Sequence, residues 1–375
     1  MKIAVASEFF PPYLAGGGER RYYEILKRIA KKHEVQVYTM KIEGAPLKET
    51  IDKIHVHRVG ITHPRDRRKY LPLLFYYLAL KNEMSKQDFD LFDGNAYISA
   101  MSGYYVAKYK NKPKVATIHD VYGERWGDYT HPLLGPVGKW IERNLLKLNF
   151  DKFIAVSGST KKLLIENGVD EKKIEIIHNG VDAKKFSNVK VKREKGKFVY
   201  VGRLVEQKNV GGLLRAFKIV HEKKPDSKLV LVGSGVGEKH FLCMARDIGL
   251  SDSVEFRGFV EANELVKEVA SASALVNPSK QEGFGLVLLE AMGAGTPVVA
   301  YDIPAYEDFA KNGQNALLAK QHNSKALAKQ MLKALDKKTA SKLILNGKKT
   351  VKKFAWDRAA NETEALYKKM LSEVK

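Results

Sequence analysis

Short apolar runs alternate with longer, helix-length stretches along nearly the whole of this 375-residue chain. The first half starts with a strand-like run, a helical stretch and a second strand-like run, at residues 2–6, 22–31 and 35–38. Further runs of strand length follow at residues 114–118 and 152–156. Such alternation is typical of βαβ units, in which helices connect neighbouring strands of a parallel sheet. The pattern therefore predicts an α/β fold.

A charged run without hydrophobic periodicity, VKVKREKGK at residues 189–197, interrupts this alternation. A new series of strand-like runs then begins, several of them continuously apolar, as strands buried on both faces of a parallel sheet are. These runs cover residues 198–202, 228–233, 253–258, 273–278 and 296–301. We therefore predict two doubly wound domains, residues 1–189 and 190–354, with ligands bound beyond the carboxyl ends of their strands.

The composition excludes several classes of protein. Cys243 is the only cysteine, which rules out an internal disulfide or a multi-cysteine metal site and favours a reducing compartment. The amino-terminal MKIAVASEFFPP has a short apolar part and no small-residue cleavage site, so we interpret it as a strand and not as a secretion signal. Residues 71–80 are apolar, but a membrane span needs about 20 residues. We expect a cytoplasmic protein, either soluble or peripheral at the inner face of the cell membrane.

The net charge of +22 divides evenly, +11 in residues 1–190 and +11 in the remainder. An even division does not favour a single polyanion groove, and the chain has no zinc-finger spacing or aromatic RNA-binding signature, so we expect no nucleic-acid partner. The positive charge is compatible with binding to phosphates or to anionic membrane surfaces. Arg65, Arg67, Arg68 and Lys69 precede the apolar residues 71–80, which fits docking on an anionic membrane or, equally, a solvated loop before a packed helix.

Two features of the first half follow strand-like runs. Gly16, Gly17 and Gly18 lie between the first strand and a helix, where backbone amides and the helix dipole suit an anion, although an ordinary loop is an equal alternative. His119 follows the run KVATI, a position that suits a functional role, although an ordinary surface or core histidine is an equal alternative. Asp88 and Asp90 have the spacing of a metal-binding pair, but acidic residues commonly flank strands, so we expect no metal site.

In the second half, Arg203 and Lys208 follow the run FVYVG. A guanidinium fork and a lysine point charge beside a sheet edge suit a diphosphate. Gly233 belongs to VGSGVG at residues 232–237, which differs from the dinucleotide fingerprint because its third glycine comes one position early. We therefore favour a loop that lines the binding cleft over a loop that itself holds phosphate.

The segment QEGFGLVLLE at residues 281–290 has a carboxylate near each end of an apolar stretch. Residues 286–292 are predicted to form a buried helix, in which Glu290 needs a protein donor or a ligand hydroxyl as partner. Glu282 precedes the helix start, whose free amides suit phosphates. The two acids are at most roughly 12 Å apart along a helix, comparable with the span of a nucleotide sugar. The alternative assigns Glu282 to helix capping and Glu290 to a buried ion pair.

Several motifs together resemble the retaining glycosyltransferases of family 4, which have the GT-B fold of two Rossmann-like domains facing across a cleft. The resemblance extends over nearly the whole chain and is weakest at residues 42–82. The motifs that support it are GGGER (16–20), HD (119–120), SGST (157–160), NGVD (179–182), GRLVEQKN (202–209) and EGFGLVLLEAMGAGTPVVA (282–300).

The resemblance implies a role for each candidate residue. Glu282 would contact the donor sugar, Glu290 the ribose, and His119 would lie beside the sugar. Arg203 and Lys208 would bind the diphosphate. Gly16 and Gly17 would lie near the phosphates. The amides of Gly283, Phe284 and Gly285 would face the sugar, and those of Leu286 and Val287 would face the phosphate. Gly233, Gly258 and Phe259 would lie at the base. The carboxyl-terminal segment, residues 355–375, resembles the family's terminal helix, which packs on the first domain; a helix that stays on the second domain is the alternative.

The implied activity is transfer of a hexosyl group, with retention, from a UDP- or GDP-sugar to a glycan or lipid-linked acceptor. Arg203 and Lys208 would stabilise the departing diphosphate, so we expect no metal and no cofactor. Two other functions stay open: an epimerase or hydrolase of nucleotide sugars on a similar fold, and a non-catalytic binder of nucleotides or polyanions. The residues do not identify the donor base, the sugar or the acceptor.

Overall fold

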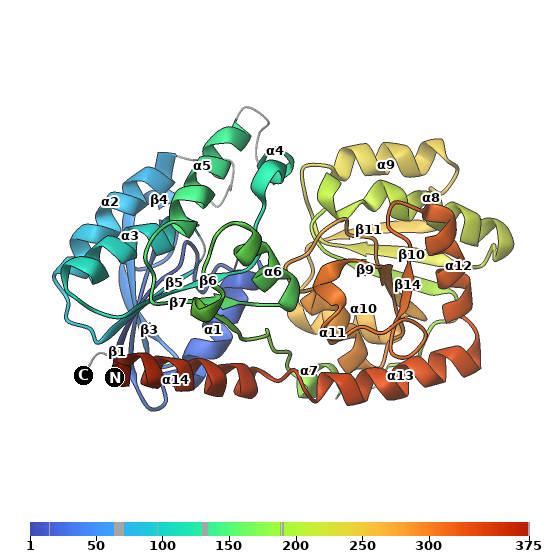
Figure 1. Cartoon of the computed structure of the whole chain (residues 1–375). Helices are drawn as coiled ribbons and strands as arrows, with labels where there is room; N and C mark the ends of the chain where they lie inside the picture. The colour runs from blue at the N-terminus through green and yellow to red at the C-terminus, as the bar shows by residue number, and fades with distance from the viewer. Residues whose placement is uncertain are drawn as a thin grey trace. The chain divides into compact units, whose positions relative to one another are not determined.

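The computed structural model describes residues 1–14, 16–63, 71–95, 97–129, 134–187, 189 and 191–373. It divides into two compact units, which are coloured by residue number in Figure 1. The first unit comprises Met1–Gly180 and Trp356–Lys375, and the second comprises Val181–Ala355. Arg65, Arg67, Arg68 and Lys69, the basic run considered for membrane docking, lie outside the described residues.

The first unit is built on an eight-stranded sheet with the order β3-β4-β2-β1-β5-β6-β7-β8, parallel throughout except for the β3–β4 pair. Its strands are β1 (Lys2–Ala6), β2 (Glu34–Ile42), β3 (Lys48–Ile51), β4 (Ile54–His63), β5 (Leu91–Asn95), β6 (Lys114–Ile118), β7 (Lys152–Ala155) and β8 (Ile174–Ile176). Its helices are α1 (Gly17–Ile29), α2 (Leu71–Ser85), α3 (Tyr97–Tyr109), η1 (Gly123–Arg125), α4 (Trp126–Tyr129), α5 (Gly135–Leu146), α6 (Gly158–Glu166), η3 (Glu171–Lys173) and α14 (Trp356–Glu373).

The second unit is built on a six-stranded, fully parallel sheet with the order β11-β10-β9-β12-β13-β14. Its strands are β9 (Lys197–Val201), β10 (Lys228–Val232), β11 (Val254–Gly258), β12 (Ala274–Asn277), β13 (Val298–Tyr301) and β14 (Leu317–Ala319). Its helices are α7 (Ala183–Ser187), η4 (Glu206–Lys208), α8 (Val210–Lys223), α9 (Glu238–Asp247), α10 (Ala262–Ser271), α11 (Leu286–Ala294), η5 (Pro304–Tyr306), α12 (Ser324–Ala334) and α13 (Lys337–Val351). Helices α8 and α9 lie on one side of this sheet, and α10 and α11 lie on the other (Figure 1).

The predicted class, two α/β units with doubly wound parallel sheets, is confirmed. Five predicted runs of the second half form β9 to β13. Most residues of β9, β10, β12 and β13 are buried because helices cover both faces of the sheet, whereas the residues of the edge strand β11 alternate between half-buried and exposed. The described part of residues 42–82, where the family resemblance is weakest, contains the β3–β4 hairpin and most of α2.

The second unit starts nine residues earlier than the predicted boundary at 189/190. The backbone N–H of Val181 donates to the carbonyl of Phe354 at 2.9 Å, and α7 packs against α11. The charged run misled the prediction because its residues 191–195 are exposed on the approach to β9 and are not the point where contacts change. Helix α14 belongs to the first unit, where it packs against α1.

Candidate active site

The second sheet reverses its strand order between β9 and β12. From β9 the chain adds β10 and β11 on one side, and β12 is followed by β13 and β14 on the other. The loops that leave the carboxyl ends of β9 and β12 therefore start side by side at the point where the strand order reverses, which is where open α/β sheets bind ligands. Residues 202–209 and 278–285 form these two loops.

Lys208 and Glu282 meet at this switch point, one from each loop, with Nζ 2.6 Å from Oε1. The Ser279 hydroxyl donates to the same carboxylate oxygen at 2.8 Å, and Asn277 Nδ2 lies 3.5 Å from it. The side chains of Lys208 and Glu282 are only 18% and 16% exposed. Two residues predicted separately thus form one ion pair, whose carboxylate is held in place by neutral donors.

Further contacts fasten the two loops together. The backbone N–H of Lys280 donates to the carbonyl of Gln207 at 3.0 Å. The Nζ atom of Lys280 lies 2.6 Å from Glu206 Oε1. Asn209 adopts the left-handed conformation, with φ 52° and ψ 42°, which turns the chain from η4 into α8, and its amide donates to the carbonyl of Pro278. Contacts within the protein therefore tie the two loops together at the switch point.

The pKa of Glu282 reflects competing effects. Burial acts to raise it, but the Lys208 ammonium, together with hydrogen bonds from Ser279 and Asn277, holds the pKa of this carboxyl below its ordinary value. Glu282 is consequently ionised at neutral pH. Lys208 has three N–H donors, of which the contact with Glu282 uses one, so the ammonium retains donors suited to an anion.

Gly283, Phe284 and Gly285 form the turn before α11. Gly285 has φ 91°, and a Cβ atom there would lie 2.4 Å from Cε1 of Tyr306, so both the conformation and the packing require glycine. The Phe284 ring is buried, with its centroid 5.4 Å from that of Phe309. The Phe284 side chain of this turn therefore points into the core, and the backbone of the turn leads into the start of α11.

Helix α11 begins at Leu286, as predicted, and the amides of Leu286 and Val287 lie in its first turn, where N–H groups have no acceptor within the helix. Glu290 is 5% exposed in the middle of this apolar helix, as the sequence pattern indicated. The segment from Glu282 to Glu290 is helical only from Leu286 onward. The distance between the two acids therefore does not follow from a helical rise over all eight residues.

The glycines of VGSGVG allow this loop to pack closely against the backbone of residues 202 and 204. A Cβ atom on Gly233 would lie 2.1 Å from the carbonyl oxygen of Gly202, and one on Gly235 would lie 2.4 Å from that of Leu204. The N–H of Gly233 donates to the carbonyl of Gly258 at 2.7 Å, which joins the turns after β10 and β11. Phe259, directly after β11, is 82% exposed.

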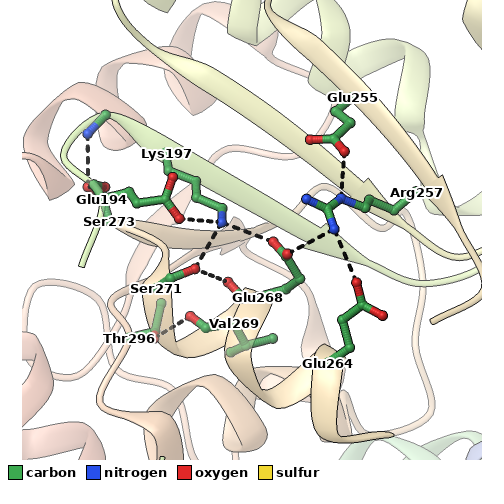
Figure 2. Close-up of polar contacts among 11 residues, drawn as sticks. Glu194, Lys197, Glu255, Arg257, Glu264, Glu268, Val269, Ser271, Ser273 and Thr296 are labelled. Carbon is green, nitrogen blue, oxygen red and sulfur yellow. Dashed lines mark hydrogen bonds and ion pairs between the residues drawn. The ribbon is translucent and has the colours of Figure 1, made fainter. Parts of the chain in front are cut away.

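Arg257, which precedes this turn, is engaged by carboxylates, as Figure 2 shows. Its guanidinium contacts Glu255 at 2.6 Å and Glu264 at 3.1 Å. Glu268 lies 3.4 Å from Arg257 and 3.0 Å from the Lys197 ammonium, and thereby links β11 to β9. The charge of Arg257 is thus used within the fold, whereas Arg203 is exposed after β9.

The first sheet has its own switch point, between β1 and β5. Ser7, directly after β1, donates to the carbonyl of Phe9 at 2.9 Å and accepts from Asn95 Nδ2 at 2.8 Å. Asn95 Oδ1 consequently faces His119 Nε2, 2.8 Å away. An amide oxygen only accepts, so Nε2 carries the proton, and Nδ1 is the acceptor nitrogen of the neutral ring.

Burial, and then the positive charge of Arg21, lowers the pKa of His119 to about 3. The imidazole therefore stays neutral at physiological pH. A Cβ atom on Gly18 would lie 2.9 Å from His119 Nε2, so glycine there lets the first turn of α1 approach the ring. Gly16 and Gly17 are exposed at the start of this helix.

The predicted residues thus fall into two groups, one in each unit. The second unit brings together Lys208 with Glu282, and Gly233 with Gly258. Asp88 and Asp90 flank β5: Asp90 accepts from the Lys2 N–H at 2.7 Å, and Asp88 lies 4.0 Å from the Lys112 ammonium. Within the described ranges, no group of three or more histidine, cysteine and acidic side chains is arranged to hold a metal ion.

Sequence reasoning missed the neutral residues that hold the site. Asn95 and Asn277 are the last residues of β5 and β12, and Ser7 and Ser279 follow strands closely. An asparagine at the end of a strand was the available signal, because the carboxyl end of a strand in a parallel sheet faces the ligand edge.

Sequence comparisons agree on one family. The family described as "Glycosyltransferase Family 4" matches residues 15–185, and "Glycosyl transferases group 1" matches residues 182–350. An uncharacterized glycosyltransferase of Methanocaldococcus jannaschii is 28% identical over 98% of both chains.

Two solved structures have the same fold. Sucrose-phosphate synthase from Thermosynechococcus elongatus superposes with a TM-score of 0.88 at 23% identity and 99% coverage of both chains. Anabaena HepE, solved in complex with UDP and glucose, superposes with a TM-score of 0.79 at 19% identity, over 98% of this chain and 100% of that one. The chain is a glycosyltransferase with the GT-B fold and belongs to glycosyltransferase family 4.

Proposed function

We propose that this protein is a retaining hexosyltransferase of the cytoplasm that transfers a sugar from a UDP- or GDP-sugar to a glycan or lipid-linked acceptor. The observation that carries the proposal is the Lys208–Glu282 pair at the switch point of the second sheet, next to the start of α11. Opposite charges side by side at the carboxyl edge of a sheet suit a ligand that has hydroxyl groups and phosphates. The complex of HepE with UDP and glucose supports a nucleotide-sugar donor.

Each part of the site suits one part of such a donor. Arg203 and Lys208 bind the diphosphate together with the first-turn amides of α11, because cations and free N–H groups attract phosphate oxygens. Glu282 accepts hydrogen bonds from the sugar hydroxyls, and Glu290 from the ribose diol. The base lies against the joined turns of Gly233 and Gly258, beside Phe259.

The proposed chemistry is electrostatic. The bond between the sugar C1 and the diphosphate oxygen breaks with both electrons going to the diphosphate, and Arg203 and Lys208 stabilise this developing charge. The acceptor hydroxyl attacks C1 from the same face, which retains the configuration, and its proton passes to the departing diphosphate oxygen on that face. Glu282 positions the sugar and stabilises its positive charge. His119 is neutral and acts as a hydrogen-bonding group, because a ring with a pKa of about 3 does not shuttle protons near neutral pH.

Two cations that stabilise the leaving group make a divalent metal unnecessary, so we expect transfer to continue after exhaustive chelation. A requirement for Mn²⁺ or Mg²⁺ that persists after controls for trace metal would contradict this. Incubation with the donor alone separates a transferase from an epimerase or hydrolase, since only the latter two would alter the donor without an acceptor.

The decisive experiment is a thermal-shift screen against nucleotide sugars, followed by turnover with the donor that binds. A bound donor raises the unfolding temperature because it binds only the folded state. We expect one donor to raise it, and Lys208→Met to weaken that shift. Absence of any shift and of any turnover across the panel would favour a non-catalytic protein.

A further inference from the structure

Exposed apolar side chains gather on three neighbouring helices of the first unit. Helix α3 packs against both α2 and α5, so the three lie side by side (Figure 1). Of the eighteen large hydrophobic residues that are exposed among the described ranges, eight are on these three helices. They are Leu71, Leu74, Phe75, Leu78, Tyr105, Tyr109, Val137 and Trp140. Scattered single residues need no explanation, but a concentration of this kind marks an interaction surface.

The clearest element of this surface is α2. Leu71, Leu74, Phe75 and Leu78 are 62%, 58%, 44% and 55% exposed, and their spacing of three, four and seven residues places them in one stripe. Another side of the same helix, including Tyr76 and Leu80, is fully buried in the core. Helix α2 is thus apolar on two sides, of which the fold covers one.

The neighbouring helices add aromatic residues. Tyr105 and Tyr109 lie one turn apart on α3 and are 41% and 87% exposed. Val137 and Trp140 lie one turn apart on α5 and are 51% and 63% exposed. Tryptophan and tyrosine are the residues that favour the boundary between lipid acyl chains and headgroups, because their rings have an apolar body and a polar group.

The charges on these helices are predominantly positive. Lys81, Lys108, Lys139 and Arg143 are their basic residues, and Glu83 and Glu142 are their only acids. Glu83 is paired with Lys48 and Lys86, and Glu142 is 1% exposed and accepts hydrogen bonds from Tyr97 and backbone amides.

One of the four cations is itself paired at the surface, since Lys139 contacts Glu124 of η1. Lys81 lies over the Tyr105 ring, 5.3 Å from its centroid. The surface therefore combines an apolar stripe, aromatic side chains and uncompensated positive charge, the features of segments that bind anionic lipid.

We propose that this surface of α2, α3 and α5 docks on the headgroup region of an anionic bilayer. Within the described residues no helix is long and apolar enough to cross a membrane, so the contact is with the membrane surface. A second copy of the chain would fit poorly, since pairing this surface with itself brings positive charges together. The proposal does not depend on the donor chemistry, but it would bring the proposed enzyme to a lipid-linked acceptor.

Vesicle co-sedimentation tests the proposal with the full-length chain. We expect binding to vesicles of phosphatidylcholine with phosphatidylglycerol, and much weaker binding to phosphatidylcholine alone. The variant Leu74→Glu/Leu78→Glu should lower the vesicle partition coefficient about tenfold or more, since two apolar anchors are replaced by charges that the lipid repels. Both leucines are more than half exposed, so the fold should tolerate the change.

A matched control is Leu242→Glu/Leu345→Glu on α9 and α13 of the second unit, where the leucines are 45% and 58% exposed. This control makes the same change in charge and should bind vesicles like the unaltered protein. Equal losses in both variants, or equal binding to neutral and anionic vesicles, would overturn the proposal. So would a dimer in light scattering that only the α2 variant dissociates. A donor-induced thermal shift retained in both variants shows that folding and donor binding are intact, and it separates this proposal from the proposed function.

Discussion

The two units place different chemistry at the same topological position. At the switch point of the first sheet, Ser7, Asn95 and His119 form a chain of neutral hydrogen bonds. At the switch point of the second sheet, Lys208 and Glu282 form an ion pair. Burial explains the neutral case, because it lowers the pKa of His119 to about 3. In the second unit burial also disfavours the charged form of Glu282, but the Lys208 charge outweighs burial and holds the pKa of Glu282 below its ordinary value. The sheet topology thus fixes where a site lies, whereas the local partners decide whether it is charged.

The largest effect should come from breaking the charged pair. Glu282→Gln keeps the shape of the side chain but removes its charge, and we expect turnover to fall about 100- to 1,000-fold, the usual loss for a group that stabilises transition-state charge. Donor affinity, measured by calorimetry, should change much less. A variant that loses donor affinity but keeps its turnover would contradict the assignment of Glu282 to transition-state stabilisation. A glycosyl adduct trapped on Glu282 would show instead that this residue is a nucleophile.

Glu290 should behave differently from Glu282, although both belong to the same unit. It is buried in α11 and is proposed to hold the ribose, which does not change during the reaction. Glu290→Ala should therefore weaken donor binding about 10- to 100-fold, as the loss of charged hydrogen bonds does, with a smaller effect on turnover. Glu290→Gln is the control for packing, and thermal unfolding checks that each variant is folded.

The neutral cluster is tested by introducing a charge. Asn95→Asp places a carboxylate beside His119 Nε2, which favours the imidazolium and should raise the pKa of His119 towards the neutral range. We expect a pH dependence between about pH 5 and 8 that the unaltered protein lacks, with about a tenfold loss of activity on the acidic side, where the ring is charged. Nitrogen NMR of the ring reports the protonation directly.

Ser7→Ala is the matched test of the tautomer. Without the Ser7 oxygen, Asn95 Nδ2 loses its acceptor and the amide is free to turn over, which would present an N–H group to His119 Nε2. The NMR signature should then move from the Nε2–H to the Nδ1–H form. An unchanged Nε2–H signature in Ser7→Ala would show that Ser7 does not orient the amide.

The smallest effect should concern stability alone. Glu364 on α14 contacts Lys368 at 2.6 Å and His33 at 3.0 Å, and these partners lower its pKa from 4.5 to about 2. Because the folded pKa is depressed, the stabilisation is present above pH 4.5 and is lost as the pH falls towards about 2. Glu364→Gln should cost about 1 kcal/mol in urea unfolding at neutral pH and flatten the acid dependence. The control is Glu362→Gln on the same helix, where the partly exposed carboxylate contacts Arg358 at 2.7 Å; its loss should cost less and leave the acid dependence unchanged.

Much of the second unit was predictable because its signals are local. Buried strands appear as continuous apolar runs, and Glu282 to Met292 show a turn followed by an apolar helix in one contiguous segment. The β3–β4 hairpin was not predicted, because an edge strand with alternating exposure has a weaker pattern. The domain boundary was misplaced because a charged run is a local feature, whereas the contact of Val181 with Phe354 joins residues far apart in the chain.

The sequence by itself determined the α/β class, the strand ends and the candidate residues that follow them, since periodicity and residue type act over a few positions. Only the tertiary structure decided which of these residues meet. Lys208 reaches Glu282, and His119 reaches Asn95, because strands remote in sequence are neighbours in each sheet. The exposed stripe of α2 also required the structure: residues 71–80 are apolar throughout, and which side faces the core depends on how the helix packs.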